Sequence, residues 1–226
     1  MVGLTLTITL TTAARELRLS WRRRATALGG LFFFVIASSL YPLALGPDPK
    51  LLHAVAPGVL WVTALFAAML STGQLFGHDY TNGALEQMVL SPQPLTLIVL
   101  GKVIAHWLTS GFILTLLVPV VAMQYDLGLT AVLPLMGSLL LGTPLLSLLG
   151  SIGAALTLGV RGGGIMLGLL VLPLEVPVLI FGAGAADFAA SPDWARANFS
   201  LLAAALCLGV WLCPWASAAA LRIAME

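Results

Sequence analysis

The sequence predicts an all-α membrane protein with six transmembrane helices, preceded by an N-terminal amphipathic helix in the membrane interface. Hydrophobic residues make up 60% of the 226 residues and charged residues only 8%, whereas about 25% of a typical soluble domain is charged. The charges are also spaced unevenly, so that long stretches carry none. Because about 20 apolar residues cross the hydrocarbon core and lipid forces such segments to be helical, each long stretch predicts one span.

The six spans are predicted from six stretches of the sequence. Five of them lack Lys, Arg, Asp and Glu, and one contains a single charged residue. They are residues 25–47, 51–78, 103–125, 127–160, 162–186 and 197–221, and the exception is Glu175. The fourth stretch is the longest, yet it is too short for two crossings and a turn. We therefore expect one span there, with an additional interrupted piece around Gly142, Thr143 and Pro144, since proline removes a helical hydrogen bond.

Basic residues predict the orientation of the spans. An even number of crossings places both termini on the same side of the membrane. If that side is the cytoplasm, it holds eight of the ten basic residues, namely Arg15, Arg18, Arg22, Arg23, Arg24, Lys102, Arg161 and Arg222, whereas Lys50 and Arg196 lie outside. Because Lys and Arg are enriched in cytoplasmic loops, both termini are predicted to be cytoplasmic.

Residues 1–24 have the pattern of an interfacial elbow helix that leads into the first span. On a helical wheel, one side gathers Leu10, Ala13, Ala14, Leu17 and Trp21, and the opposite side gathers Arg15, Arg18 and Arg22. Such a division is typical of a helix that lies in the membrane interface. The alternative is a basic tail that only sets the orientation through Arg22, Arg23 and Arg24. Both interpretations give the same topology.

Residues 77–102 form the one predicted cytoplasmic loop with organised chemistry. Asn82 is a plausible N-cap, and Glu86 falls in or just after the first turn, where the helix dipole favours an acid. Pro92 and Pro94 would stop the segment. The pattern therefore predicts a short helix over about 83–90.

This short helix is predicted to be the contact for a partner. Leu85, Met88 and Val89 share one face at helical spacing, while Glu86 and Gln87 stay polar. An apolar stripe with polar flanks suits a groove on another protein. Asp79 and Tyr80, which precede the helix in the same loop, belong to the same predicted contact. The alternative is that the stripe lies on lipid headgroups.

Three polar residues in or beside the spans are candidates for contacts with partners. An ionised Glu175 would cost at least about 2.5 kcal/mol in the bilayer unless it is paired or protonated. It either contacts a partner or is a neutral acid bonded to carbonyls freed by Pro173 and Pro177. His106, together with Lys102 one turn earlier, could form a contact at the cytoplasmic end, or could be bonded within the bundle.

Charge and motifs exclude several classes of function. A net charge of +1 leaves no basic surface for a phosphate backbone, so nucleic acid is not an expected partner. The two cysteines, Cys207 and Cys213, have no spacing typical of a metal site, and we expect no bound metal. No GxxxxGK[ST] phosphate loop occurs, so ATP is expected on another subunit. The chain has no HExxH, no paired acids in the spans and no nucleophile elbow, and is not expected to be an enzyme.

Two blocks of the sequence are especially specific, LFGHDYTNGALEQMVLSPQPL at 75–95 and GKVIAHWLTSG at 101–111. They resemble the heme exporter protein B (CcmB) family. Others follow the same order along the chain, at 41–62, 139–164, 170–182 and 218–223. The resemblance covers most of the chain and implies a single permease domain over 1–226 with an ABC-2-type fold.

The resemblance also implies a function and partners. The chain would be a permease subunit in the bacterial inner membrane that pairs with the ATPase subunit CcmA, works beside CcmC and CcmD, and forms a dimer with a second copy. ATP and Mg would bind the partner, and hydrolysis would drive release of the haem-loaded periplasmic chaperone CcmE. We expect the closing ATPase to carry the helix at 83–90 with it and to tilt spans two and three.

Haem is expected to be handled by the complex without being bound by this chain. The six tryptophans are scattered, with no cluster in an outside loop, and His53 and His78 fall on opposite sides of the membrane. Whether haem passes through the spans stays open. Two other functions stay open as well: an ABC-2-type permease for another lipid or polysaccharide, and an intramembrane enzyme.

Overall fold

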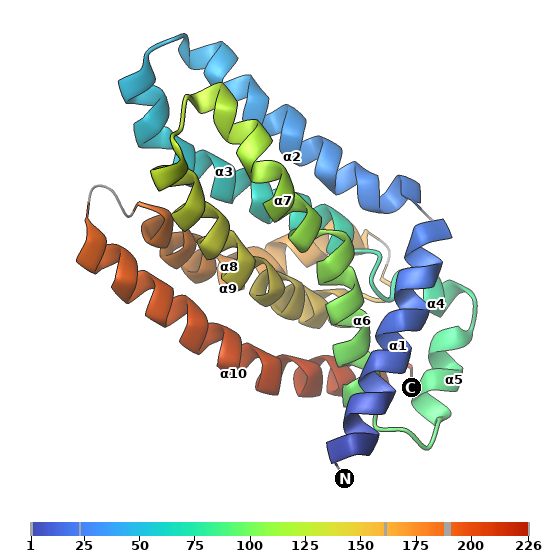
Figure 1. Ribbon diagram of the computed structural model, residues 1–226. Helices are drawn as coiled ribbons and strands as arrows, with labels where there is room; N and C mark the ends of the chain where they lie inside the picture. The colour runs from blue at the N-terminus through green and yellow to red at the C-terminus, as the bar shows by residue number, and fades with distance from the viewer. Residues whose placement is uncertain (1, 23, 161, 188–190, 226) are drawn as a thin grey trace.

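The computed structural model describes residues 2–22, 24–160, 162–187 and 191–225. In these ranges the chain is helical apart from short turns, with no strand (Figure 1). Of the basic residues used to predict orientation, Arg23 and Arg161 lie outside the described residues. The side chains of Trp21, Arg22 and Arg24 lie outside them too. The all-α fold is confirmed.

Helices of the described ranges follow one another with few residues between them. In order they are α1 (Val2–Arg22), α2 (Arg24–Leu45), α3 (Pro49–Thr72), α4 (Gly77–Thr81), α5 (Ala84–Leu90), α6 (Leu95–Thr109), α7 (Gly111–Ala122), the 3₁₀ turn η1 (Met123–Tyr125), α8 (Leu129–Leu156), α9 (Gly163–Ala186) and α10 (Pro192–Ala224). Six segments are long and apolar enough to cross a membrane: Leu28–Leu45, Pro49–Thr81, Leu95–Tyr125, Leu129–Leu156, Gly163–Ala186 and Pro192–Ala224. The six-span prediction is confirmed.

The start of α1 and the end of α10 lie at the same end of the helix bundle, together with α4 and α5 (Figure 1). The turns that join α2 to α3 and α7 to α8 lie at the opposite end. A hydrogen bond of 2.9 Å between His53 Nε2 and the carbonyl oxygen of Asp126 links these two turns. This arrangement follows from an even number of crossings, and it separates His53 from His78 as expected.

The fourth span is one uninterrupted helix, so the expected break around residues 142–144 was wrong. α8 contains Pro134 and Pro144 and continues through both. Gly142 has a packing role instead, because a Cβ there would lie 2.1 Å from the ring of Trp61. Gly182 on α9 is equally close to the same ring. A membrane helix tolerates proline where its neighbours satisfy the freed backbone groups.

Hydroxyl groups along α8 bind the neighbouring helices. Trp61 of α3 donates to Ser138 at 3.0 Å, and Trp107 of α6 donates to Thr143 at 3.0 Å. Nearer the other end of α8, Ser151 and Ser217 of α10 are 2.8 Å apart. Hydrogen bonds between helices are a main source of helix association in lipid, where the hydrophobic effect between spans is absent. α8 is therefore the central helix of the bundle.

The third span is the interrupted one, between α6 and α7 at Ser110. The backbone of Ser110 has φ −119° and ψ −77°. The hydroxyl of Thr109 donates to the carbonyl of Ala105, and that of Ser110 donates to the carbonyl of His106. Such bonds from side chain to backbone compete with the helical ladder and bend helices. Gly111 then brings α7 against α8, since a Cβ there would lie 2.7 Å from Thr143.

The same span also begins earlier than the charge pattern predicted. α6 begins at Leu95, whereas the charge-free stretch begins at 103. Lys102 is therefore inside the helix, and its side chain is only 2% exposed. A buried lysine needs a partner of opposite charge.

Candidate functional site

The segment between the second and third spans consists of two short helices, α4 and α5, which together we call the coupling segment (residues 77–90). We expected Asn82 to be the N-cap of α5, but this was wrong, because Asn82 ends α4. Gly83 precedes α5 with φ 69°, a left-handed conformation that suits glycine, and it makes the turn between the two helices. Pro92 and Pro94 act as predicted, because α5 ends at Leu90 and α6 begins at Leu95.

The apolar stripe of α5 lies inside the protein. Leu85 is 1% exposed and Met88 7% exposed. Both belong to a hydrophobic cluster that also contains Phe76, Val99 of α6 and Ile8 of α1. The expectation that Leu85 and Met88 enter a groove on a partner was therefore wrong. The stripe fastens α5 to its own chain, and Val89 is partly buried beside it.

The opposite face of α5 is the one that a partner can reach. Glu86 and Gln87 are exposed, as expected for the polar flanks. Leu90 is 84% exposed, although it is a leucine at the end of an otherwise well-packed helix. Sequence reasoning missed Leu90; its signal was the spacing, since it lies three and four residues after Gln87 and Glu86 and shares their side of the helix.

An ion cluster joins the coupling segment to two other helices. The ammonium group of Lys102 on α6 contacts the carboxylate of Asp79 on α4 and forms an ion pair of 3.1 Å with Glu16 Oε1 on α1. The side chains are 2%, 10% and 18% exposed for Lys102, Asp79 and Glu16. The cluster is therefore largely shielded from water. Opposite charges attract one another more strongly in such a shielded place than they do in water. Asp79 and Lys102 were predicted as contacts with a partner, but they contact each other.

Close packing of α1 on α6 places Glu16 beside Lys102. A Cβ on Gly101 would lie 2.8 Å from the carbonyl oxygen of Thr9 and 2.8 Å from Thr12. Only glycine allows the two helices to approach so closely. The buried side of α1 contains Ile8, Thr9 and Ala13, whereas Leu10, Ala14, Arg15 and Arg18 are exposed. The apolar side predicted for α1 is thus divided: Ala13 is buried, whereas Leu10 and Ala14 are exposed.

Tyr80 connects the coupling segment to the turn between α8 and α9. Its hydroxyl oxygen lies 2.9 Å from the position that a Cβ on Gly159 would take. Gly159 has φ 76°, so glycine is required there both for the turn and for the space. Tyr80 is also 41% exposed. One side of its ring therefore faces the chain, and the rest is accessible to a partner.

His106 is bonded within the bundle, which is one of the two alternatives that the sequence left open. Its Nε2 lies 3.0 Å from the hydroxyl of Ser71 on α3, and its Nδ1 lies 3.1 Å from that of Ser147 on α8. Ser71 already donates its proton to the carbonyl of Ala68. We therefore assign Nε2 as the donor to Ser71 and Nδ1 as the acceptor from Ser147. His106 is a neutral link between three spans.

Comparison with known proteins identifies the family. The family model described as CcmB protein matches residues 7–224. The chain belongs to the CcmB family. It is 48% identical to heme exporter protein B of Pseudomonas aeruginosa over 94% of this chain and 95% of the relative. It is 46% identical to the protein of the same name in Haemophilus influenzae over 94% and 96%. With that of Escherichia coli K12 the identity is 43% over 93% and 96%.

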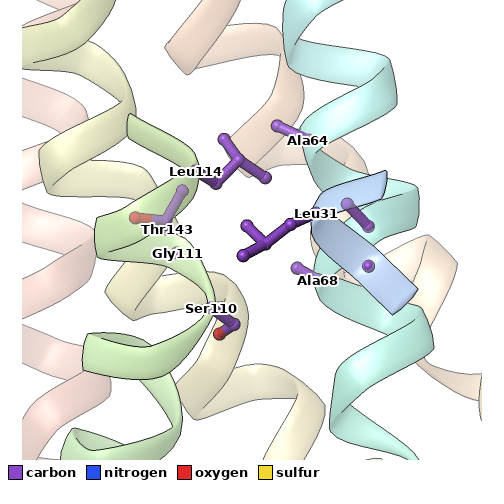
Figure 2. Close-up of a pocket in the computed structure, with 9 residues that line it drawn as sticks. Leu31, Ala64, Ala68, Ser110, Gly111, Leu114 and Thr143 are labelled. Atoms are coloured by element: carbon purple, nitrogen blue, oxygen red, sulfur yellow. The ribbon is translucent and has the colours of Figure 1, made fainter. Parts of the chain in front are cut away.

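One pocket in this CcmB-family chain lies at the break in the third span. It is lined by Gly30, Leu31, Ala64, Ala67, Ala68, Ser110, Gly111, Leu114 and Thr143, so that α7 and α8 face α2 and α3 across it (Figure 2). Its volume is about 10 Å³, which is room for about one water molecule. A porphyrin does not fit in this pocket.

Glu175 is buried in the inner face of α9. It is 1% exposed and lies on the same side as Val171, Val178 and Gly182. Its Oε2 atom has no hydrogen-bond partner. The bond to a carbonyl freed by a flanking proline, which we considered from the sequence, is absent at this atom. Within the described ranges, no group of three His, Cys, Asp or Glu residues could hold a metal ion.

Proposed function

We propose that this chain is the membrane subunit of an ABC complex that exports or handles haem for the assembly of c-type cytochromes. The observation that carries the proposal is the similarity to proteins named heme exporter protein B, which extends over more than nine-tenths of both chains. Six apolar segments and the lack of a phosphate loop agree with a permease subunit that depends on another chain for ATP.

The coupling segment is the proposed contact for the ATPase subunit, CcmA. Its exposed side presents Glu86, Gln87 and Leu90, with part of Tyr80 nearby. Its other side is bound to the chain through Leu85, Met88 and Asp79. A segment fastened on one side and exposed on the other can transfer a displacement from a partner to the spans. The contact residues replace the apolar stripe that the sequence suggested.

The proposed orientation places the coupling segment and both termini in the cytoplasm of a bacterial inner membrane. The distribution of basic residues supports it, because Lys50 and Arg196 alone fall at the other end among the basic residues that the structure describes. In this orientation CcmA, with ATP and Mg, binds from the cytoplasm. CcmC, CcmD and a second copy of this chain would lie beside it in the membrane, and the chaperone CcmE would be released on the periplasmic side.

Haem is proposed to be handled elsewhere in the complex. The pocket at Ser110 has room for about one water molecule, and a porphyrin does not fit in it. His53, on the proposed periplasmic side, is bonded to the carbonyl of Asp126. The role of this chain would then be mechanical: ATP hydrolysis by CcmA displaces the coupling segment, and the spans transmit the movement to the haem-loaded chaperone.

Deletion of the gene tests the proposal. The expected result is loss of all c-type cytochromes together with accumulation of haem-bound chaperone in the membrane, both restored by the wild-type gene on a plasmid. Normal c-type cytochromes in the deletion strain would contradict it. They would instead favour an ABC-2-type permease for another lipid or polysaccharide.

A further inference from the structure

The cluster of Glu16, Asp79 and Lys102 is the point at which charged side chains of three helices meet. Asp79 belongs to the coupling segment, Lys102 to the third span and Glu16 to the N-terminal helix. The three residues are far apart in the sequence, so only the fold brings them together. Two carboxylates share one ammonium group, and among the described side chains Lys102 is the cation paired with both acids.

Apolar packing reinforces the same connection. Leu85 and Met88 of α5, Ile98 and Val99 of α6, and Ile8 of α1 belong to one hydrophobic cluster. Close-packed side chains of this kind do not deform gradually. The same cluster extends to α8, α9 and α10, so the packing alone does not single out α1 and α6. The ionic contacts at Lys102 do so, because they join only α1, α4 and α6 among the described residues.

The break at Ser110 separates α6 from α7. His106 and Trp107 bind the adjacent end of α6 to α3 and α8, so that the end with Lys102 is the one that can shift. α6 ends at Thr109 and α7 begins at Gly111. The pocket beside the break leaves a small void next to α7. Hinges are commonly a few residues at the ends of helices. The half of the third span that carries Lys102 is therefore the half that can pivot.

We propose that Glu16, Asp79 and Lys102 form a coupling joint, which makes α1 and α6 move together with the coupling segment when a partner displaces it. This inference rests on the proposed function of the coupling segment. In it the three residues are positioning residues, which contact neither the partner nor haem. The N-terminal helix, expected from the sequence only to lead into the first span, becomes a moving part.

The test uses the complete complex with two substitutions that remove one charge and keep the size, Glu16→Gln and Asp79→Asn. Asp193→Asn is the matched control, because Asp193 forms an exposed ion pair with Arg196 at the other end of the bundle. We expect wild-type amounts of chain and ATPase subunit in the purified complex for all three variants. We expect the yield of c-type cytochromes to fall about tenfold for Glu16→Gln and Asp79→Asn and to stay unchanged for Asp193→Asn.

A second measurement follows the movement itself. With Cys207 and Cys213 replaced by alanine, a fluorophore is attached at Leu10→Cys on α1 or at Thr81→Cys on α4, both exposed positions. In the otherwise wild-type complex both probes should respond to ATP. With Glu16→Gln added, the probe at residue 81 should still respond, and the response at residue 10 should fall about tenfold. A purely structural role of Glu16 would not separate the two probes.

Two outcomes would contradict the proposed coupling joint. One is an ATP response at residue 10 that Glu16→Gln leaves unchanged. The other is loss of the ATPase subunit from the Glu16→Gln and Asp79→Asn complexes, which would make the cluster part of the docking surface. Failure of the proposed function is distinct from both, because it would appear as normal cytochromes in the deletion strain.

Discussion

Two regions of the bundle are held together by different physical means. Around α8, neutral hydrogen bonds connect the spans: Trp61 to Ser138 and Ser151 to Ser217, and the bond from Trp107 to Thr143 attaches the end of α6 to the same helix. Around α6, charges do so, because Lys102 is paired with Asp79 and Glu16. We call the first region the α8 bundle (α3, α7, α8, α9 and α10) and the second the coupling end (α1, α4, α5 and α6).

The difference indicates which region moves. In the α8 bundle, Gly142 of α8 and Gly182 of α9 both pack directly against the ring of Trp61 of α3. This close packing leaves no room for the three helices to slide past one another. The coupling end packs short helices against α6, and its span is broken at Ser110. Ionic contacts connect whole elements that can shift as a group. We therefore interpret the α8 bundle as a frame and the coupling end as the part that a partner drives.

Replacing the shared cation should have the largest effect on stability. Lys102→Met leaves two largely buried carboxylates without a counter-charge, which costs about 3–5 kcal/mol of the free energy of unfolding. The measurement is thermal unfolding of the detergent-purified chain. Arg196→Met is the control, since the side chain of Arg196 is 71% exposed and its pair should contribute about 0–1 kcal/mol. Equal effects of the two substitutions would remove the distinction between the coupling end and an ordinary surface ion pair.

A methyl group at Gly142 should disturb the α8 bundle next most. Its Cβ would lie 2.1 Å from the ring of Trp61, and overpacking of this kind costs about 1–3 kcal/mol. Gly58→Ala on α3 is the control, because a Cβ there meets nothing within 4 Å. Thermal unfolding of both variants gives the comparison. If Gly142→Ala unfolds at the wild-type temperature, the frame is looser than the structure indicates.

Loss of a single hydroxyl should cost less. Ser147→Ala removes the hydrogen bond to His106 Nδ1, and such bonds in membrane bundles contribute about 0.6 kcal/mol on average. Ser200→Ala is the matched control, because the exposed hydroxyl of Ser200 donates to the carbonyl of Arg196 on its own helix. A loss of free energy of unfolding at Ser200 as large as at Ser147 would show that the link between helices adds nothing.

Replacing Leu90 should hardly change stability while it weakens the partner contact. Exposed positions usually tolerate substitution within about 0.5 kcal/mol, and Leu90 is 84% exposed. Leu90→Asp should therefore leave the chain in the membrane and reduce co-purification of the ATPase subunit about tenfold. Leu129→Asp, at a residue 77% exposed at the other end of the bundle, is the control. Co-purification unaffected by Leu90→Asp would place the contact elsewhere on the chain.

These predictions differ from what the sequence alone would have suggested. An apolar stripe on a short helix has two meanings, contact with a partner or contact with the chain itself, and the pattern of Leu85, Met88 and Val89 is the same in both. Only the tertiary structure shows that Leu85 and Met88 are buried. An acidic residue at Leu85 would therefore damage the fold, and Leu90 is the position that tests docking.

The number of spans could be predicted because lipid imposes one strong rule on every segment. Long stretches without charge must be helical and must cross, so the spacing of charges contained the answer. The coupling joint could not be predicted, since Lys102 lies beside Asp79 and Glu16 only after α1 and α4 have folded onto α6. The break at Ser110 was missed for a different reason. The prolines of α8 gave a stronger sequence signal for a helix break than Thr109 and Ser110 did.

The central claim is that the coupling segment faces the cytoplasm, where an ATPase can reach it. In a chain with Cys207 and Cys213 replaced by alanine, a cysteine is placed either at Thr81 or at Asp193, whose side chain is 98% exposed at the opposite end. A thiol reagent that cannot cross the inner membrane is then added to intact cells. The predicted result is that the reagent labels residue 193 in intact cells. Residue 81 should be labelled only after the cells are opened. Labelling at residue 81 in intact cells would contradict the account.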